Sequence, residues 1–149
     1  MKNFRFRYEN ILKLKEDAED KVKHELAMIN SKLVQLKNEL DYFRHEEVSY
    51  LHSVDKLLSN GCSAFDLRNI ENYKNFHRKR IKSQEMEVER TEELLALKKG
   101  ELVEAIKEKK IMEKLKEREY NSYLENVKAA EEKVVDQIVS YKSTKSSGE

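Results

Sequence analysis

The sequence has no proline, no tryptophan, one cysteine and three glycines among its 149 residues. Proline and glycine are the residues least compatible with a helix interior, so their scarcity leaves few points at which a helix must end. A lone cysteine excludes an internal disulfide and is typical of proteins from a reducing compartment. Three scattered glycines also exclude a glycine-rich phosphate-binding loop.

The chain also lacks an excess of either charge and any long apolar run. Lys and Arg number 30 and Asp and Glu number 29, a net charge of +1, whereas nucleic-acid binders that neutralise phosphates need a clustered basic excess. No apolar run exceeds about four residues, against roughly 20 for a helix that spans a bilayer. The basic N-terminal segment has no apolar core, so it does not resemble a secretory signal. We therefore expect no nucleic-acid partner, no membrane-spanning segment and a cytoplasmic protein.

Charged residues make up 40% of the chain and hydrophobic residues 38%. This composition is typical of a long coiled coil if the apolar residues are periodic, and of disorder if they are not. In the first half they are periodic, because steps of four and three alternate as in the a and d positions of a coiled coil. The series comprises Val22, Leu26, Ile29, Leu33, Leu36, Leu40, Phe43, Tyr50, Val54 and Leu57, and Phe4, Tyr8, Ile11 and Ala18 extend it toward the N-terminus.

The repeat returns in the second half of the chain with a different character. Apolar residues recur every seventh position, at Ile81, Val88, Leu95 and Leu102. The positions half a heptad away are polar, which predicts a thin seam between helices: Gln84, Thr91 and Lys98. A cleaner apolar stripe follows nearer the C-terminus, at Tyr120, Leu124, Val127, Val134, Ile138 and Tyr141.

Between the two halves, the short stretch SNGCSAF interrupts the helical pattern at residues 59–65. Gly61 suits the left-handed conformation that ends a helix, and Ser63 followed by Asp66 resembles a capping box that begins one. These signals predict an all-α, antiparallel two-helix coiled-coil hairpin in one domain, residues 1–142. We expect a helix at about 4–59, a turn at about 60–65, a longer helix at about 66–142 and a flexible tail at 143–149. The alternative is a kink in one continuous helix.

The two predicted helices differ in length, which leaves part of the second without a partner. Counted outward from the turn, Phe4 would lie opposite residues near 121, so most of the C-terminal stripe would have no chain of its own to pack against. An exposed stripe of this kind favours a docking surface. The alternatives are a frayed helix or an end that self-associates.

Aromatic residues also gather on both sides of the turn. A two-helix seam can bury only about half of them, and exposed aromatic side chains are favoured anchors in interfaces. The alternative is that they pack together to close the hairpin. They are Tyr42, Phe43, Tyr50, Phe65, Tyr73 and Phe76.

The sequence offers no constellation for catalysis or cofactor binding. Four histidines, His24, His45, His52 and His77, raise the question of a metal site. His45 and His52 share a helix face but are two turns apart, roughly 10 Å along the axis, too far to share one metal ion. Cys62 has no paired base or resolving thiol in the sequence. Acidic residues in such a composition usually belong to solvated helix faces that pair with basic residues four positions on, as Glu9 with Lys13, Asp17 with Lys21 and Glu19 with Lys23 do. We therefore expect no enzyme, no catalytic residue, no metal, no cofactor and no small-molecule ligand.

Three stretches of the chain resemble the flagellar export protein family FliJ. The opening FRFRYENILKLKEDAED is similar to that family's aromatic and basic start, and NGCSAFDLRNIENYKNF to its turn. The segment MEKLKEREYNSYLENVKAAEEKVVDQI resembles its C-terminal part, with Gln137 where the family often has an acid. The resemblance covers nearly the whole chain and implies a non-enzymatic component of the flagellar type III export apparatus, needed for flagellum assembly and motility.

The resemblance also implies partners. Family members form a stalk-like coiled coil whose terminal end binds and stimulates the export ATPase ring, while the rod contacts the membrane-embedded export gate and export chaperones. Such a protein would be cytoplasmic and peripherally associated with the membrane at the flagellar base. The candidate ATPase-docking residues are then Phe4, Phe6, Tyr8, Tyr120, Leu124, Val127, Val134, Ile138 and Tyr141, and the candidate gate-docking residues are Phe43, Tyr50, Tyr73 and Phe76. The alternatives are the stalk of a virulence secretion system, a structural tether or a chaperone.

Overall fold

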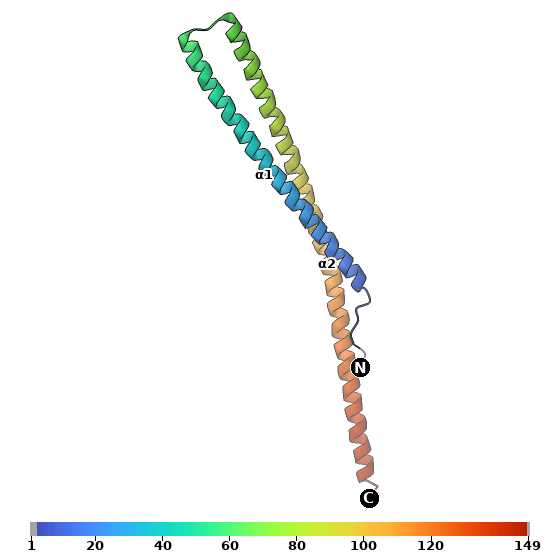
Figure 1. Cartoon of the computed structure of the whole chain (residues 1–149). Helices are drawn as coiled ribbons and strands as arrows, with labels where there is room; N and C mark the ends of the chain where they lie inside the picture. The colour runs from blue at the N-terminus through green and yellow to red at the C-terminus, as the bar shows by residue number, and fades with distance from the viewer. Residues whose placement is uncertain (1–2, 149) are drawn as a thin grey trace. The chain divides into compact units, whose positions relative to one another are not determined.

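The computed structural model describes residues 3–148, which form two helices and no strand. Helix α1 runs over Glu9–Asn60 (52 residues) and helix α2 over Ala64–Ser146 (83 residues). Figure 1 shows the reversal of the chain between them. The predicted all-α hairpin with a longer second helix is confirmed.

The turn is built by the residues that predicted it. Gly61 has a φ of +86°, in the left-handed region that side chains with a Cβ rarely adopt, and α1 ends directly before it. The amide of Asp66 donates to the Ser63 hydroxyl, and the amide of Ser63 donates to the Asp66 carboxylate, both at 3.2 Å. This reciprocal pair is a capping box, and it starts α2 at Ala64, two residues earlier than expected.

The start of the first helix differs from the prediction. Residues 3–6 have no regular secondary structure, residues 7–8 form a turn, and α1 begins at Glu9 rather than near residue 4. At the other end, α2 continues to Ser146, beyond the predicted 142.

The described residues divide into two units. Residues 3–20 and 104–148 form unit 1, and residues 21–103 form unit 2. In unit 1 the segments are antiparallel, because Lys15 pairs with Glu108 at 2.9 Å and Glu9 with Lys116 at 3.0 Å. In unit 2 the same direction follows from the Glu25–Lys98 pair at 2.7 Å and the turn itself. Whether residues 1–142 behave as one domain stays a prediction.

The core of unit 2 is apolar on α1 and largely polar on α2. Leu33 and Leu40 are buried on α1, whereas the buried residues on the facing part of α2 include His77 and Thr91. Gln84, half a heptad from Ile81, donates hydrogen bonds to the Leu36 carbonyl (3.0 Å) and the Glu39 carboxylate (3.1 Å). The predicted thin seam is therefore present, and its polar members largely pair with α1 or with their own backbone. Leu57 departs from the predicted series because it is 42% exposed.

The core of unit 1 combines the N-terminal segment, α1 and α2. Phe6 and Leu12 are buried, and so is the charged Glu19. The Glu19 carboxylate lies 2.6 Å from the ammonium of Lys109 on α2, and this partner raises the pKa of Lys109 above its ordinary value. A buried carboxylate needs such a partner, because burial of an uncompensated charge is strongly unfavourable.

Candidate docking surfaces

The N-terminal aromatic residues pack against α2 within unit 1. The Phe4 ring lies 5.1 Å from the Tyr120 ring in an edge-on arrangement and 5.6 Å from the Tyr123 ring. The prediction that Phe4 lies opposite residues near 121 is therefore confirmed. Phe4, Tyr120 and Tyr123 are called the Phe4 cluster below. Phe4 is half-buried and Tyr120 is 44% exposed, so this cluster keeps part of its aromatic surface in solvent.

Phe6 and Tyr8, two further candidates for ATPase docking, are less exposed than most of the other candidates. Phe6 is only 5% exposed; its ring is 5.9 Å from that of Tyr8, and the Lys116 ammonium stands 6.0 Å above it. Its burial leaves little of the ring for a partner, so Phe6 chiefly stabilises unit 1. Tyr8 is half-buried and lies under the Arg7 guanidinium at 5.4 Å.

The C-terminal stripe of α2 is exposed along its length. Val134, Ile138 and Tyr141 are 55%, 51% and 68% exposed, Leu124 is 45% exposed and Val127 is half-buried. The sequence reasoning missed two neighbours, Val135 and Val139, which are 57% and 60% exposed. Val135 and Val139 directly follow Val134 and Ile138 in the sequence. These two pairs of consecutive apolar residues could have indicated them. From here on, the C-terminal stripe means the predicted stripe without Tyr120 and with these two valines added. Its seven residues are Leu124, Val127, Val134, Val135, Ile138, Val139 and Tyr141.

The candidates for gate docking meet near the turn within unit 2. The Tyr50 ring of α1 is 4.8 Å from the Tyr73 ring of α2, and the Tyr73 ring is 5.6 Å from that of Phe76. Tyr73 and Phe76 are each 51% exposed, whereas Tyr50 is half-buried. The hairpin thus joins residues from both helices into one aromatic patch, defined as Phe43, Tyr50, Tyr73 and Phe76.

Arg80 connects the fourth member of the patch to the others. Its guanidinium lies 4.0 Å above the Phe43 ring and 5.4 Å from the Phe76 ring, a cation–π arrangement. It also pairs with the Glu46 carboxylate on α1. Hydrogen bonds from Arg80 and, second, from Tyr42 lower the pKa of Glu46. The same contact with Glu46 raises the pKa of the Tyr42 hydroxyl.

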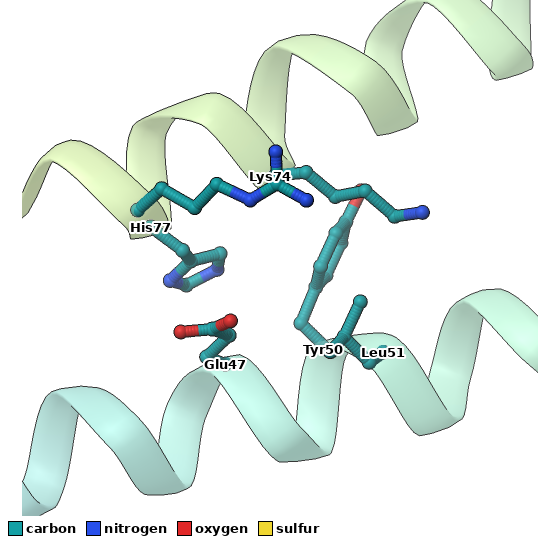
Figure 2. Close-up of a pocket in the computed structure, with 6 residues that line it drawn as sticks. Glu47, Tyr50, Leu51, Lys74 and His77 are labelled. Carbon is teal, nitrogen blue, oxygen red and sulfur yellow. The ribbon is translucent and has the colours of Figure 1, made fainter. Parts of the chain in front are cut away.

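His77 is the residue of this region whose place the sequence reasoning missed, because it weighed His77 only as a metal ligand. It is 4% exposed, and its ring lies 5.4 Å from Tyr50 and 5.1 Å from Tyr73. Neither ring nitrogen has a hydrogen-bond partner among the described residues. Figure 2 shows the ring facing the Glu47 carboxylate. Both residues line a cavity of about 60 Å³. Its position seven residues before Gln84 was the signal that places it in the seam.

Among residues 3–148, no group of three or more His, Cys, Asp or Glu side chains is placed to hold a metal ion. The same part of the chain contains no helix that is long and apolar enough to cross a membrane. Features that could act on another molecule are the C-terminal stripe, the Phe4 cluster and the aromatic patch.

Two long helices packed against each other, with no strand among the described residues, place the protein in the class of all-α coiled-coil hairpins. Comparison with protein families gives a sharper answer, because the family model described as "Flagellar FliJ protein" matches residues 4–148. The chain belongs to the flagellar FliJ family. Membership makes it a helical component of the flagellar type III export apparatus. Searches of curated proteins and of solved structures give no significant match.

Proposed function

We propose that this protein is a non-enzymatic, stalk-like coupling rod that binds and stimulates the export ATPase ring through unit 1. The observation that carries the proposal is the C-terminal stripe, in which every large aliphatic or aromatic side chain except that of Val127 is 45% exposed or more. A soluble protein rarely leaves so continuous an apolar surface uncovered unless a partner covers it. Tyr120, whose ring packs against Phe4 and is 44% exposed, adds apolar surface in the same unit.

The second contact of the rod is the export gate, which the aromatic patch would bind. Tyr73 and Phe76 are half exposed. The Tyr73 ring packs against Tyr50, and the Phe76 ring packs against the buried His77. Rigid aromatic side chains of this kind are frequent interface anchors, because they bury a large area at a small cost in conformational entropy. A rod held by these two contacts would be cytoplasmic and peripherally associated with the membrane, and would also be open to export chaperones.

The proposed mechanism is allosteric. A rod stimulates an ATPase only if it binds one conformation of the ring more tightly than another, since a ligand with equal affinity for both shifts nothing. The C-terminal stripe would supply this difference through apolar contact area, which changes with the shape of the surrounding surface. No residue of the rod takes part in hydrolysis under this proposal.

The test is the hydrolysis rate of the export ATPase titrated with this protein, with ring assembly followed by light scattering. We expect saturable stimulation and more assembled rings. Deletion of residues 121–149 should remove both effects, whereas Tyr73→Ala/Phe76→Ala should leave them intact and weaken binding to the gate. No binding and no stimulation with an active ATPase would refute the coupling rod.

A structural tether is the competing function, because the same C-terminal stripe could join two copies of the chain. It predicts strong self-association in the absence of the ATPase, whereas the coupling rod predicts a monomer. Sedimentation equilibrium over a wide concentration range separates the two. The stalk of a virulence secretion system shares the rod architecture, but the match to the flagellar family favours the flagellar apparatus.

A further inference from the structure

The side of α2 that faces away from α1 carries an excess of positive charge between residues 65 and 82. Helical spacing places this side, called the basic face, opposite the buried Ile70 and His77. Four of its positions are basic, and Glu71 is the one acidic member. The members, all exposed, are Phe65, Arg68, Glu71, Asn72, Asn75, Phe76, Arg78, Lys79 and Lys82.

The next five turns of the same helix provide the comparison. Eighteen residues make five turns of an α-helix, so each position of the basic face has a counterpart on the same side, eighteen residues further on. The counterparts carry two acidic residues and one basic residue, so the net charge of this side falls from +3 to −1. Solvent exposure alone therefore does not explain the composition of the basic face. The counterparts, also exposed, are Ser83, Met86, Glu89, Arg90, Glu93, Leu94, Ala96, Leu97 and Gly100.

The cations of the basic face are not neutralised within the hairpin. Arg80, which follows two of them in the sequence, reaches toward α1 and pairs with Glu46. No carboxylate among residues 3–148 forms an ion pair with the four cations of the face, so their charge is available to an external anion. These cations are Arg68, Arg78, Lys79 and Lys82.

The other charged groups of this stretch lie toward α1 or at the turn. Lys74 and Glu47 line the cavity beside His77, on the seam side of α2. The Asp66 carboxylate accepts a hydrogen bond from the Ser63 amide and caps the start of the helix. Glu71 is therefore the one carboxylate of α2 between residues 65 and 82 that an anion on the basic face would meet.

Two phenyl rings accompany the cations of the basic face. Phe65 is 70% exposed and Phe76 is 51% exposed. Helices that lie on a membrane surface combine these two kinds of side chain, because cations stay among the anionic headgroups while apolar groups enter the boundary with the acyl chains. The basic face extends over roughly 25 Å of one helix. Cations spread along such a convex surface fit an array of headgroups better than one acidic side chain, which converging cations would bind.

We propose that the basic face of α2 lies directly on an anionic lipid surface. Each Lys or Arg close to such a surface adds to the attraction, and salt screens it. A net charge of +3 on the face gives a weak and reversible contact. This contact goes beyond the proposed function, in which the protein reaches the membrane only through the export gate. The two contacts would reinforce each other, because a rod held at one site is already close to the second.

Lipid binding is measured by co-sedimentation of the purified full chain with vesicles of phosphatidylcholine that contain about 30% phosphatidylglycerol. We expect binding at low salt, release at high salt and no binding to vesicles of phosphatidylcholine alone. Lys79→Gln/Lys82→Gln should weaken binding at least fivefold. Lys128→Gln/Lys133→Gln, which removes the same charge from exposed positions of α2 in unit 1, should change it less than twofold.

Two results would overturn the proposal. One is the absence of binding to the anionic vesicles, including the case in which the chain binds an acidic polypeptide such as polyglutamate instead. The other is equal weakening by the two double variants, which would mean that net charge alone decides binding. The vesicles contain no protein, so neither result depends on the export gate or the ATPase.

Tryptophan fluorescence identifies the part of the chain that touches the lipid, because the natural sequence contains no tryptophan. Phe65→Trp places a reporter on the basic face, and Tyr141→Trp places the matched control on the C-terminal stripe, at a position 68% exposed against 70% for Phe65. In anionic vesicles that contain brominated phosphatidylcholine, we expect quenching of the reporter at 65 and none at 141. Quenching only at 141, or at neither position, would overturn the proposal.

Discussion

The two ends of α2 reverse the usual relation between polarity and burial. In unit 2, His77 and Thr91 lie half a heptad from the apolar residues of α2 that recur every seventh position, and both are about 95% buried. In unit 1, Val134 and Ile138 are more than half exposed. The polar residues are buried because α1 covers them, and the apolar residues are exposed because no described part of unit 1 covers them.

This contrast separates residues that hold the hairpin together from residues available to a partner. The polar seam residues of unit 2 are compensated by specific contacts, such as Lys98 with Glu25 at 2.7 Å and Thr91 with the Glu87 carbonyl at 2.8 Å. No described residue covers the exposed side chains of the C-terminal stripe. A partner protein would remove their apolar surface from water, which is why we propose that the ATPase binds there.

The largest expected effect distinguishes the two surfaces by stability. Leu33→Ala removes a side chain that is 6% exposed in the seam and should lower the free energy of unfolding by about 2–4 kcal/mol. Val134→Ala acts on an exposed residue and should change it by no more than about 0.5 kcal/mol. Urea unfolding followed by circular dichroism measures both. Equal losses would mean that the C-terminal stripe is packed in the free protein.

A smaller effect of opposite sign is expected in the polar seam. His77→Leu replaces a buried ring that has no hydrogen-bond partner among the described residues and should raise the free energy of unfolding by about 1 kcal/mol. Gln84→Leu is the matched control, because it removes two hydrogen bonds to α1 and should bring no gain. The same urea titration applies. Destabilisation by His77→Leu would show that the imidazole makes a contact that stabilises the fold.

The smallest effect concerns pH. The pKa values of Glu25 and Glu46 lie below their ordinary value of 4.5, chiefly because of hydrogen bonds from Lys98 and Arg80. A lowered folded-state pKa stabilises the fold above the ordinary pKa, and this stabilisation is lost as pH falls through the folded value. We therefore expect Glu25→Gln/Glu46→Gln to melt at lower temperature than wild type at pH 7 and to approach it near pH 3. If the difference in melting temperature between wild type and variant stayed the same from pH 7 to pH 3, these two ion pairs would not be the cause of the pH dependence.

Much of the hairpin could be predicted because local signals and long-range packing agree. Gly61, Ser63 and Asp66 mark the turn through their own backbone and capping chemistry, and counting from the turn places Phe4 opposite Tyr120. The alternation of apolar residues every three or four positions then fixes which side of α1 is buried. These features depend on spacing, which a sequence displays directly.

Two features escaped prediction because they depend on tertiary contacts. The spacing of Phe4, Tyr8 and Ile11 fits a helix, yet residues 3–8 are not helical, and Phe6 is buried against neighbours that sequence spacing does not reveal. His77 was weighed only as a metal ligand, although its seam position follows from Gln84, Thr91 and Lys98 at intervals of seven. Heptad position would have placed the histidine correctly without a structure.

The most direct test of the central claim is hydrogen exchange of the backbone amides of residues 124–146, with and without the export ATPase. The account predicts fast exchange in the free protein, because no described chain covers this part of α2, and strong protection once the ATPase is bound. The amides around Leu33 and Leu40 should be protected in both states. Unchanged exchange at residues 124–146 with saturating ATPase would contradict the account.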